Sequence, residues 1–367
     1  MAGAKPTTIT DVATHAGVSL ATVSRVMNGN ATVDPALAER VRASAAELGY
    51  SANPLARSLV LGKTQTISVV VPDLSNPTFQ GMLRGLSRAA VADGYHVLVA
   101  DSDEHEDQER LFALESRRRS DGLVLCAPRM SDAALAEVLA EVAPVVLVNR
   151  AGDAPSVAAD YRTPLRRVID HLYGLGHRRI AYLAGAKRSA SNAQRLAALD
   201  DARATLDGCE IVEIPAGVDF AAGAGSLDAV IDSGATAVLA FNDLSAMGLL
   251  SAATERGLSV PGDLSIAGFD DIPFARYTSP ALTTAAVPTG ELGALAWRAL
   301  HALLRGESAE ATHTVVPEVI LRGTTGAPAR RSLGRPPRGL GDSRATVEKT
   351  FPESVSRLGG VRHEGEP

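Results

Sequence analysis

The sequence predicts an α/β protein with an all-α N-terminal domain and a core of two lobes, each built on a parallel sheet. Three observations predict this fold. Two short helical segments flank Gly17 near the N-terminus. From Thr66 onward, apolar runs alternate with amphipathic stretches, as in a parallel sheet flanked by helices. The nine strand-like runs are more than one doubly wound sheet usually holds, so two lobes with a cleft between them fit better.

Length and composition restrict the class of protein. A chain of 367 residues with 46% hydrophobic and 21% charged residues suits a soluble protein of two or three domains. The two cysteines, Cys126 and Cys209, lie far apart, so we expect buried thiols and neither a disulfide framework nor a CxxC metal site. The sequence lacks a bilayer-length apolar run and a signal-peptide pattern, which predicts a cytoplasmic protein.

The net charge of −6 is unevenly distributed. Residues 1–63 carry six Lys/Arg against four Asp/Glu, residues 328–367 carry eight against five, and the middle of the chain is therefore acidic. The N-terminal segment 1–63, whose helical part we call the head, has a charge of only +2, so its electrostatic attraction to DNA is weak. A DNA-binding role for this head therefore favours two copies acting together.

The first 52 residues contain the signals of three helices. Thr8 and Asp11 have the spacing of a capping box for a first helix that ends at Gly17. Ser19 is the expected cap of a second helix that runs to about residue 27. A third begins with Asp34-Pro35 and ends at Gly49. Their expected common core consists of Val12, Ala16, Val23, Val26, Leu37, Val41 and Leu48.

The linker and the core follow. Residues 53–63 include a segment, 53–59, that suits a helix too short to be stable alone in water. The expected strands of the core are 67–71, 96–100, 122–126, 145–148, 180–183, 210–214, 237–241, 264–268 and 283–287. Asn76-Pro77 and Thr163-Pro164 are the expected starts of two helices. Gly, Pro, Arg and Ser dominate residues 328–367, which predicts a disordered tail.

Several strings carry a resemblance to a known family. They are Asp11-Val12-Ala13, Ala16-Gly17-Val18-Ser19, Thr22-Val23-Ser24-Arg25-Val26, Asn28-Gly29, Asn53, Ala56-Arg57-Ser58-Leu59, Ser75-Asn76-Pro77-Thr78-Phe79, Asp121-Gly122, Leu175-Gly176-His177-Arg178-Arg179-Ile180-Ala181, Asn242-Asp243, Gly268-Phe269-Asp270-Asp271 and Pro280-Ala281-Leu282-Thr283-Thr284. With these strings the chain resembles transcription regulators of the lactose-repressor (LacI/GalR) type over about residues 7–325.

The resemblance implies a domain layout. It consists of a helix-turn-helix DNA-binding domain (1–52), a hinge helix or linker (53–63), a periplasmic-binding-protein-like core with two Rossmann-like lobes (64–327) and the tail (328–367). By that likeness the chain crosses between lobes near residues 161, 260 and 288. Lobe 1 then comprises about 64–161 and 260–287, and lobe 2 about 162–259 and 288–327.

The resemblance also implies DNA contacts. Positions matching Leu20, Ala21 and Arg25 contact base edges in the family. Arg25 can pair with guanine, whereas the two apolar residues suit a thymine methyl. The alternative is a solvated helix face. Thr8 and Thr22 are expected at phosphates or, alternatively, as caps or packing residues. Leu59 resembles a minor-groove wedge, or else covers the linker where it meets the core. The expected set is Thr8, Ser19, Leu20, Ala21, Thr22, Ser24, Arg25, Asn28, Asn53, Ala56 and Leu59.

The resemblance further implies a small-molecule effector, a sugar or sugar derivative, bound between the lobes. Aromatic faces and Arg, Asp and Asn groups suit its C–H groups and hydroxyls. The alternatives are a helix N-cap for Asp243 and a core position for Phe79. The chain departs from the family at Tyr161 and Leu199, where Asn and Gly are common. The expected set is Phe79, Asn149, Arg150, Asp160, Ser191, Arg195, Phe220, Asn242 and Asp243.

Together these features predict a repressor that binds a palindromic operator and is switched by its effector, either as inducer or as corepressor. In the family that the chain resembles, tetramers use a C-terminal leucine-heptad helix; the tail here has no such heptad, so the resemblance favours a homodimer. A transporter's solute-binding protein needs an export signal and no DNA head, and a sugar-modifying enzyme needs a catalytic constellation, which the sequence lacks. We expect no cofactor, and we interpret His105 and its acidic neighbours as a solvated loop and not as a metal site.

Overall fold

The computed structural model describes residues 7–27, 32–50, 62–185 and 188–329. The N-terminal domain consists of α1 (Ile9–Ala16), α2 (Leu20–Met27) and α3 (Pro35–Glu47). Val12, Val23 and Val41 are fully buried between these helices, as the apolar spacing predicted. The predicted caps are confirmed: Thr8 and Asp11 form a capping box, and the Asp34 carboxylate accepts hydrogen bonds from two backbone N–H groups.

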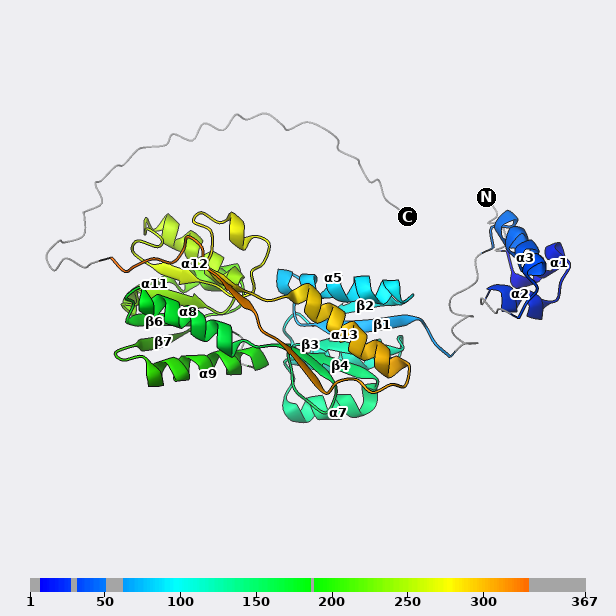
Figure 1. Ribbon diagram of the computed structural model, residues 1–367, viewed down its shortest axis with the longest axis horizontal. Helices are drawn as coiled ribbons and strands as arrows, with labels where there is room; N and C mark the ends of the chain where they lie inside the picture. The colour runs from blue at the N-terminus through cyan, green and yellow to red at the C-terminus, as the bar shows by residue number, and fades with distance from the viewer. Residues whose placement is uncertain (1–6, 28–31, 51–61, 186–187, 330–367) are drawn as a thin grey trace, which may run out of the picture. The chain divides into compact units, whose positions relative to one another are not determined.

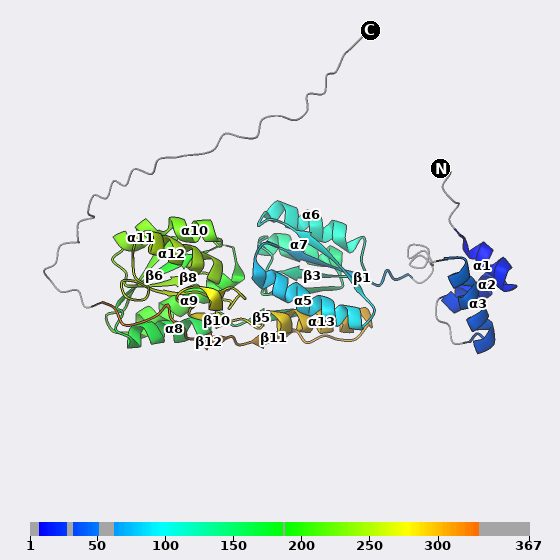
Figure 2. The same cartoon turned by 90° about the horizontal axis from the view of Figure 1, so that it is seen from above.

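Lobe 1 is built on a parallel sheet with the strand order β11-β5-β4-β3-β1-β2 within the described residues. Helices α5 and α13 cover one face of this sheet, and α6 and α7 cover the other (Figure 2). Its elements are β1 (Thr66–Val71), α5 (Pro77–Ala92), β2 (His96–Asp101), α6 (Glu106–Arg117), β3 (Gly122–Cys126), α7 (Asp132–Val142), β4 (Val145–Val148), β5 (Ser156–Ala159), α13 (Thr289–Leu304) and β11 (Thr312–Val315).

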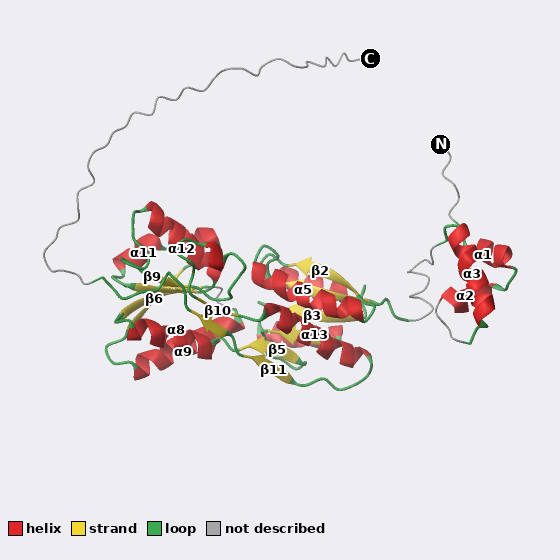
Figure 3. Ribbon diagram, turned by 45° about the horizontal axis from the view of Figure 1, so that its top comes forward, coloured by secondary structure: helices red, strands yellow, loops and turns green. Residues whose placement is uncertain are grey.

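Lobe 2 is built on a second parallel sheet with the order β7-β6-β8-β9, joined by an antiparallel β10-β12 pair. Its strands also lie between helices (Figure 3). Its elements are α8 (Arg162–Gly174), β6 (Arg179–Ala184), α9 (Ala190–Thr205), β7 (Glu210–Pro215), α10 (Phe220–Gly225), α11 (Leu227–Asp232), β8 (Ala237–Ala240), α12 (Asp243–Glu255), β9 (Ser265–Ala267), a 3-10 turn (Ala275–Tyr277), β10 (Thr284–Ala286) and β12 (Glu318–Ile320).

All nine predicted strands are found, and no end differs from its prediction by more than one residue. The predicted division between the lobes is wrong beyond residue 260. Strand β9 pairs with β8, so residues 260–287 belong to lobe 2. Helix α13 packs on α5 and β11 pairs with β5, so residues 289–315 belong to lobe 1. The chain therefore crosses near residues 161 and 288, as expected, and a third time between β11 and β12, but not near 260.

Two glycines let α13 lie close to α5 (Figure 1). A Cβ atom on Gly85 would lie 2.0 Å from the carbonyl oxygen of Gly290, and one on Gly293 would lie 2.0 Å from that of Met82. Only glycine permits such a backbone approach. The contact brings a segment from the far end of the chain against the first helix of the core.

Among the residues that the structure describes, no helix has both the length and the apolar character that crossing a bilayer requires.

Candidate functional site

Helix α2 has one face exposed to solvent. Gly17 ends α1 in the left-handed conformation (φ 64°), and Ser19 Oγ accepts a hydrogen bond from the Thr22 N–H (3.2 Å). Val23 and Val26 point into the domain core, which leaves Leu20, Ala21 and Arg25 exposed. Leu20 is 48% exposed. This short helix therefore presents two apolar side chains and one cationic side chain to solvent.

The remaining residues predicted to contact DNA fall into two groups. Thr8 caps α1, and its hydroxyl donates to Asp11 Oδ2 (2.8 Å), so the capping role expected as one alternative is present. Ser19 and Thr22 bond to each other at the start of α2 through their hydroxyl oxygens (2.9 Å), and Ser24 is partly buried on the same helix. Asn28, Asn53, Ala56 and Leu59 lie outside the described residues.

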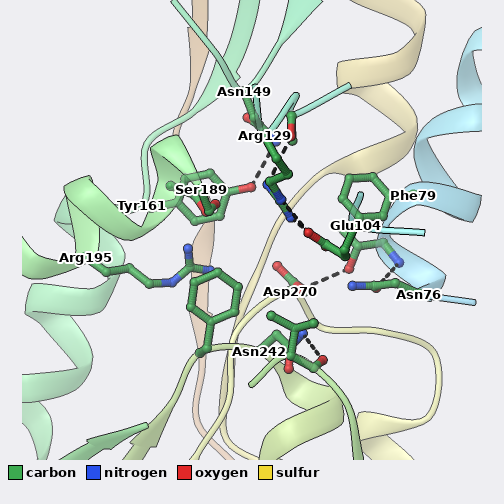
Figure 4. A pocket seen from close by; sticks show the side chains of 15 residues that line it. Asn76, Phe79, Glu104, Arg129, Asn149, Tyr161, Ser189, Arg195, Asn242 and Asp270 are labelled. Carbon is green, nitrogen blue, oxygen red and sulfur yellow. Dashed lines mark hydrogen bonds and ion pairs between the residues drawn. The ribbon is translucent and has the colours of Figure 1, made fainter. Parts of the chain in front are cut away.

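A second candidate site lies between the lobes (Figure 4). Loops at the carboxyl ends of β1, β2, β3 and β4 border it from lobe 1, and α9 and the loops after β7, β8 and β9 border it from lobe 2. This is the edge at which parallel α/β sheets place their ligands. The lining residues are Asn76, Thr78, Phe79, Glu104, Ala127, Arg129, Asn149, Tyr161, Ser189, Ser191, Arg195, Val218, Phe241, Asn242 and Asp270. The free volume between them is about 40 Å³, which is room for a few water molecules.

Arg195 is the central cation of this cavity. It is 1% exposed, and its Nε and Nη1 atoms have no hydrogen-bond partner among the described residues. Its guanidinium carbon lies 4.2 Å from the centre of the Phe241 ring, 4.4 Å from that of Tyr161 and 4.6 Å from that of Phe269. Aromatic faces attract a cation but cannot accept both N–H groups as a carboxylate or hydroxyl would. Arg195 is therefore held in place with donor groups left for a bound molecule.

Asp270 supplies a carboxylate to the same cavity. Its Oδ2 accepts a hydrogen bond from Thr78 Oγ1 (2.9 Å), which joins the loop after β9 to the first turn of α5 in the other lobe. Burial raises the pKa of Asp270 to about 6, although the Arg195 charge and the Thr78 hydroxyl act in the opposite direction. The group is therefore ionised at neutral pH and ready to accept a hydrogen bond.

The lobe 1 wall carries a second pair of charges (Figure 4). Arg129 donates to Glu104 through Nε (2.6 Å) and Nη2 (2.8 Å). Glu109 fixes this loop because its buried carboxylate accepts the backbone N–H groups of Arg129 and Met130 (2.7 and 2.9 Å). Burial raises the pKa of Glu109. Arg129 therefore lies in a fixed position on the wall opposite Arg195.

Tyr161 and Asn149 complete the polar lining. The Asn149 amide donates to the Tyr161 hydroxyl (3.0 Å) and accepts from the Ala159 N–H (2.9 Å). Burial raises the pKa of the Tyr161 phenol, so it stays a neutral hydroxyl. The departure from the family at this position thus places a large aromatic side chain in the cavity.

Backbone strain also concentrates at this site. Among the described residues, non-glycine residues with positive φ include Glu104, Ala127, Asn149 and Asp270, all of which line the cavity. Asp270 has the largest value, 113°. Such conformations cost about 1–3 kcal/mol each and usually mark functional positions.

The structure brings together five of the nine predicted effector residues: Phe79, Asn149, Ser191, Arg195 and Asn242. Phe79 is also 93% buried, so its two predicted roles coexist. The expectation for Phe220 is wrong in this structure. That ring is 47% exposed at the start of α10 and borders a separate surface hollow with Met247.

Three further predicted residues serve local structure and do not line the cavity. Asp160 accepts from the N–H groups of Arg162 and Thr163 in the first turn of α8, and Tyr161 is the N-cap residue, so Thr163 is not the cap. Arg150 binds Asp132 and two backbone carbonyls. Asp243 is fully buried and accepts from Thr284 Oγ1 (2.6 Å) and the Ile272 N–H (2.8 Å). Its burial, and then its proximity to Asp270, raise its pKa. Asn242, not Asp243, is the N-cap of α12.

Sequence reasoning missed several lining residues, above all Glu104, Arg129 and Asp270. Asp270 was part of a string that carried the resemblance, and Glu104 and Arg129 follow strands that had been predicted. Their position at the carboxyl ends of β2, β3 and β9 was the available signal. In the described part of the chain, no group of three or more His, Cys, Asp or Glu side chains is arranged to hold a metal ion, and this also applies to His105 and its acidic neighbours.

Comparisons with known proteins cover both sites. Residues 8–53 match the profile of bacterial regulatory proteins of the lacI family, and residues 169–325 match that of the periplasmic binding protein-like domain. The HTH-type transcriptional repressor CytR of Escherichia coli (strain K12) is 34% identical over 87% of this chain and 96% of its own length. Catabolite control protein A of Priestia megaterium is 31% identical over 85% and 97%, respectively.

Solved structures agree with the fold. A lac repressor dimer bound to operator and the anti-inducer ONPF has a TM-score of 0.79 with 28% identity, and covers 88% of this chain and 100% of that one. A complex of the transcriptional regulator CelR with cellobiose has a TM-score of 0.62 with 26% identity, and covers 87% and 99%. The predicted fold class, a helical head with two parallel-sheet lobes, is therefore confirmed.

Proposed function

The chain belongs to the LacI family of bacterial transcriptional regulators, and we propose that a polyhydroxylated small molecule in the inter-lobe cavity controls its affinity for an operator. It is a DNA-binding regulator with a periplasmic-binding-protein-like effector domain, and not an enzyme. The proposal concerns what this particular chain recognises and how the two sites work together.

The observation that carries the ligand proposal is the pairing of Arg195 with Asp270. Arg195 offers N–H donors without partners, and Asp270 offers an ionised acceptor in the same small cavity. A hydroxyl group satisfies both, since it can accept from one and donate to the other. The Phe79 and Phe241 rings supply faces for C–H groups. A sugar combines these features, and the two charges balance each other, which favours a neutral ligand.

Relatives support this chemical class. CelR was solved with cellobiose, and a LacI family regulator from Enterococcus faecium was solved with ribose. For this chain we propose a ligand of monosaccharide size, because Tyr161 and Arg195 fill much of the cavity. A free volume of about 40 Å³ is smaller than such a ligand. Binding must therefore move side chains or separate the lobes, and that movement is what the operator-binding domains can sense.

DNA recognition is proposed for the exposed face of α2. Arg25 would pair with a guanine edge, and Leu20 and Ala21 would contact thymine methyl groups in the major groove. Ser19, Thr22 and Ser24 would contact or position phosphates. A single head with three reading side chains and little net charge binds weakly, so we propose a homodimer on a palindromic operator. The protein would act in the cytoplasm, where the DNA is.

Two exposed apolar regions support self-association. Strand β2 is an edge strand of the lobe 1 sheet, and its Leu98 and Val99 are 46% and 45% exposed. On lobe 2, Phe220 and Met247 border an apolar hollow between α10 and α12. Exposed edge strands and apolar patches of this kind usually mark interfaces. A second copy of this chain is the occupant that we propose for both.

The test is a thermal-shift screen of sugars and nucleosides on the full chain, repeated with the Arg195→Met variant. Arg178→Met is the matched control, because Arg178 also lies over an aromatic ring (3.8 Å from the Tyr173 centroid) in lobe 2 but away from the cavity. We expect a neutral sugar to raise the melting temperature of the wild type and of the control but not of Arg195→Met. Binding to the selected operator with and without each hit then shows whether the ligand releases or strengthens DNA binding. A ligand that stabilises all three proteins equally would refute the proposed site.

A further inference from the structure

The linker joins the core at a point that is held by a single carboxylate. Asp121 Oδ1 accepts hydrogen bonds from the Thr64 N–H (2.7 Å) and the Thr64 hydroxyl (2.8 Å). Asp121 Oδ2 accepts from the Gln65 N–H (2.9 Å). The Asp121 N–H in turn donates to the Thr66 carbonyl (2.7 Å), beside the register in which β1 pairs with β3. We call Asp121, Thr64 and Gln65 the linker anchor.

Backbone conformation shows how firmly this point is fixed. Gln65 has φ of +51°, which is costly for a residue with a side chain. Its carbonyl accepts from the His96 N–H at the start of β2 (2.9 Å), while its own N–H binds Asp121 at the start of β3. Residues at the starts of two different strands of lobe 1 therefore hold a strained residue two positions after the predicted linker, 53–63. Such strain persists only where the surroundings over-determine the conformation.

Folding of the core has little need of these contacts. Thr64 is exposed and Asp121 is half-buried, so water can replace the hydrogen bonds if the carboxylate is removed. Strand β1 itself is secured by its pairing with β2 and β3 and by the buried residues that follow Thr66. The linker anchor therefore keeps Gln65 in a strained conformation while its hydrogen bonds add little to the stability of the core. This combination points to a role outside folding.

We propose that Asp121 is a positioning residue that sets the effective length of the linker and, with it, the spacing of operator half-sites that the dimer accepts. The inference rests on the proposed function, because it assumes two heads tethered to two cores. Without the carboxylate, residues 64 and 65 join the linker. Two extended residues add about 7 Å of reach, which corresponds to about two base pairs along DNA. A looser tether also restricts the heads less, so the DNA-bound arrangement costs more conformational entropy.

The first test compares operator variants. An operator is selected from random DNA with the wild-type chain, and one or two base pairs are inserted or removed between its half-sites. We expect a two-base-pair change to weaken wild-type binding about tenfold or more. Asp121→Ala should bind the parent operator about three- to tenfold more weakly and lose only about threefold on the same spacing change. Asp121→Asn keeps one carbonyl oxygen and should fall between the two.

Asp263→Ala is the matched control, because Asp263 also accepts a backbone N–H (Ser259, 2.8 Å) in an exposed turn, but in lobe 2. It should keep the wild-type dependence on spacing. A wild-type spacing profile and parent affinity in Asp121→Ala would overturn the proposal, whatever the variant's melting temperature.

A second test does not depend on DNA. Trypsin cleaves after Lys63, the residue before the anchor. In the full chain, Asp121→Ala should raise the cleavage rate of the Lys63–Thr64 bond about tenfold at an unchanged melting temperature, because the protease needs a locally open segment. An unchanged cleavage rate would show that Asp121 does not hold residues 64 and 65 in place, and would overturn the proposal. If the wild type selects no palindrome but Asp121→Ala is cleaved faster, the anchor exists and the proposed operator binding has failed.

Discussion

Replacing Asp270 with asparagine should stabilise the core at neutral pH and not at acidic pH. Asparagine keeps the shape of the side chain and an oxygen that can accept the Thr78 hydroxyl. It removes the charge whose burial raises the pKa of Asp270 from 3.8 to about 6. The side chain is 8% exposed, so solvent screening of this effect is small.

The sign and size of the effect follow from the two pKa values. Below pH 3.8 the carboxyl group is protonated in both the folded and the unfolded chain, and its burial costs nothing extra. Between pH 3.8 and about 6 the unfolded chain releases the proton while the folded chain retains it, so stability falls as the pH rises. At about 1.36 kcal/mol per pKa unit, the full cost above pH 6 is roughly 3 kcal/mol.

The pKa of about 6 already includes the opposing effects of the Arg195 charge and the Thr78 hydroxyl, so neither is subtracted again. Asp270→Asn should therefore be about 3 kcal/mol more stable than the wild type at pH 7, and this advantage should disappear near pH 4. The buried charge on Asp270 also raises the pKa of Asp243. Removing it relieves that repulsion, which acts in the same direction.

Urea unfolding at pH 4 and pH 7 measures this difference. The single tryptophan, Trp297, is 1% exposed in α13, so its fluorescence reports the core and not the head. The exposed Asp263→Asn serves as the control and should show no such dependence on pH. If the free-energy difference between Asp270→Asn and the wild type is the same at both pH values, the Asp270 carboxylate is not buried as a charge in the folded core.

Three further predictions concern the head and the proposed dimer. Arg25→Ala should cost roughly 1–3 kcal/mol per half-site on the selected operator but not on random DNA at the same salt concentration; equal losses on both, or the same loss for the exposed Arg40→Ala, would exclude base reading. Asp34→Ala removes a carboxylate that accepts from the Ala36 and Leu37 N–H groups (3.0 Å each) and should destabilise the head by about 1 kcal/mol, measured by its own thermal transition. Leu98→Asp should dissociate the dimer in analytical ultracentrifugation, whereas Leu111→Asp, at a similarly exposed leucine (51%) on α6, should not; a Leu98→Asp dimer of unchanged stability would remove β2 from the interface.

The sequence was sufficient to predict elements that bury long apolar runs. Strand β3, Gly122–Cys126, is buried at every position and was predicted with its observed ends. Strands β5, β11 and β12 were missed. Each has three or four residues, and β11 (Thr-His-Thr-Val) has no apolar run because it lies at a sheet edge. Such a strand is stabilised by its neighbour, Ser156–Ala159, and not by its own composition.

Lobe membership was not predictable in the same way. An apolar run shows that a strand is buried, but not which of two similar sheets it joins. Residues 265–267 were therefore placed in lobe 1, whereas they pair with β8 in lobe 2. The composition of the cavity was unpredictable for a similar reason. Arg129 and Asp270 are about 140 positions apart, and they line the same cavity only because strand ends from both lobes converge there. Phe220 shows the converse: an aromatic side chain without local apolar neighbours lay on the surface and not in the cavity.

The connection of the linker to only one lobe would link the two proposals, control by a ligand and a homodimer. Thr64 is tied to Asp121 at the start of β3, so the linker attaches to lobe 1. In a single chain, a rotation of lobe 2 against lobe 1 changes nothing at Thr64, because the anchor lies within lobe 1. If a second copy stays bound to the lobe 2 surface around Met247 while the proposed contact at β2 shifts, lobe 2 becomes the fixed reference. The same rotation then changes the separation of the two Thr64 residues, and with it the fit of two heads to two half-sites. A variant that stays monomeric but still binds the sugar should therefore lose the effect of the sugar on DNA binding.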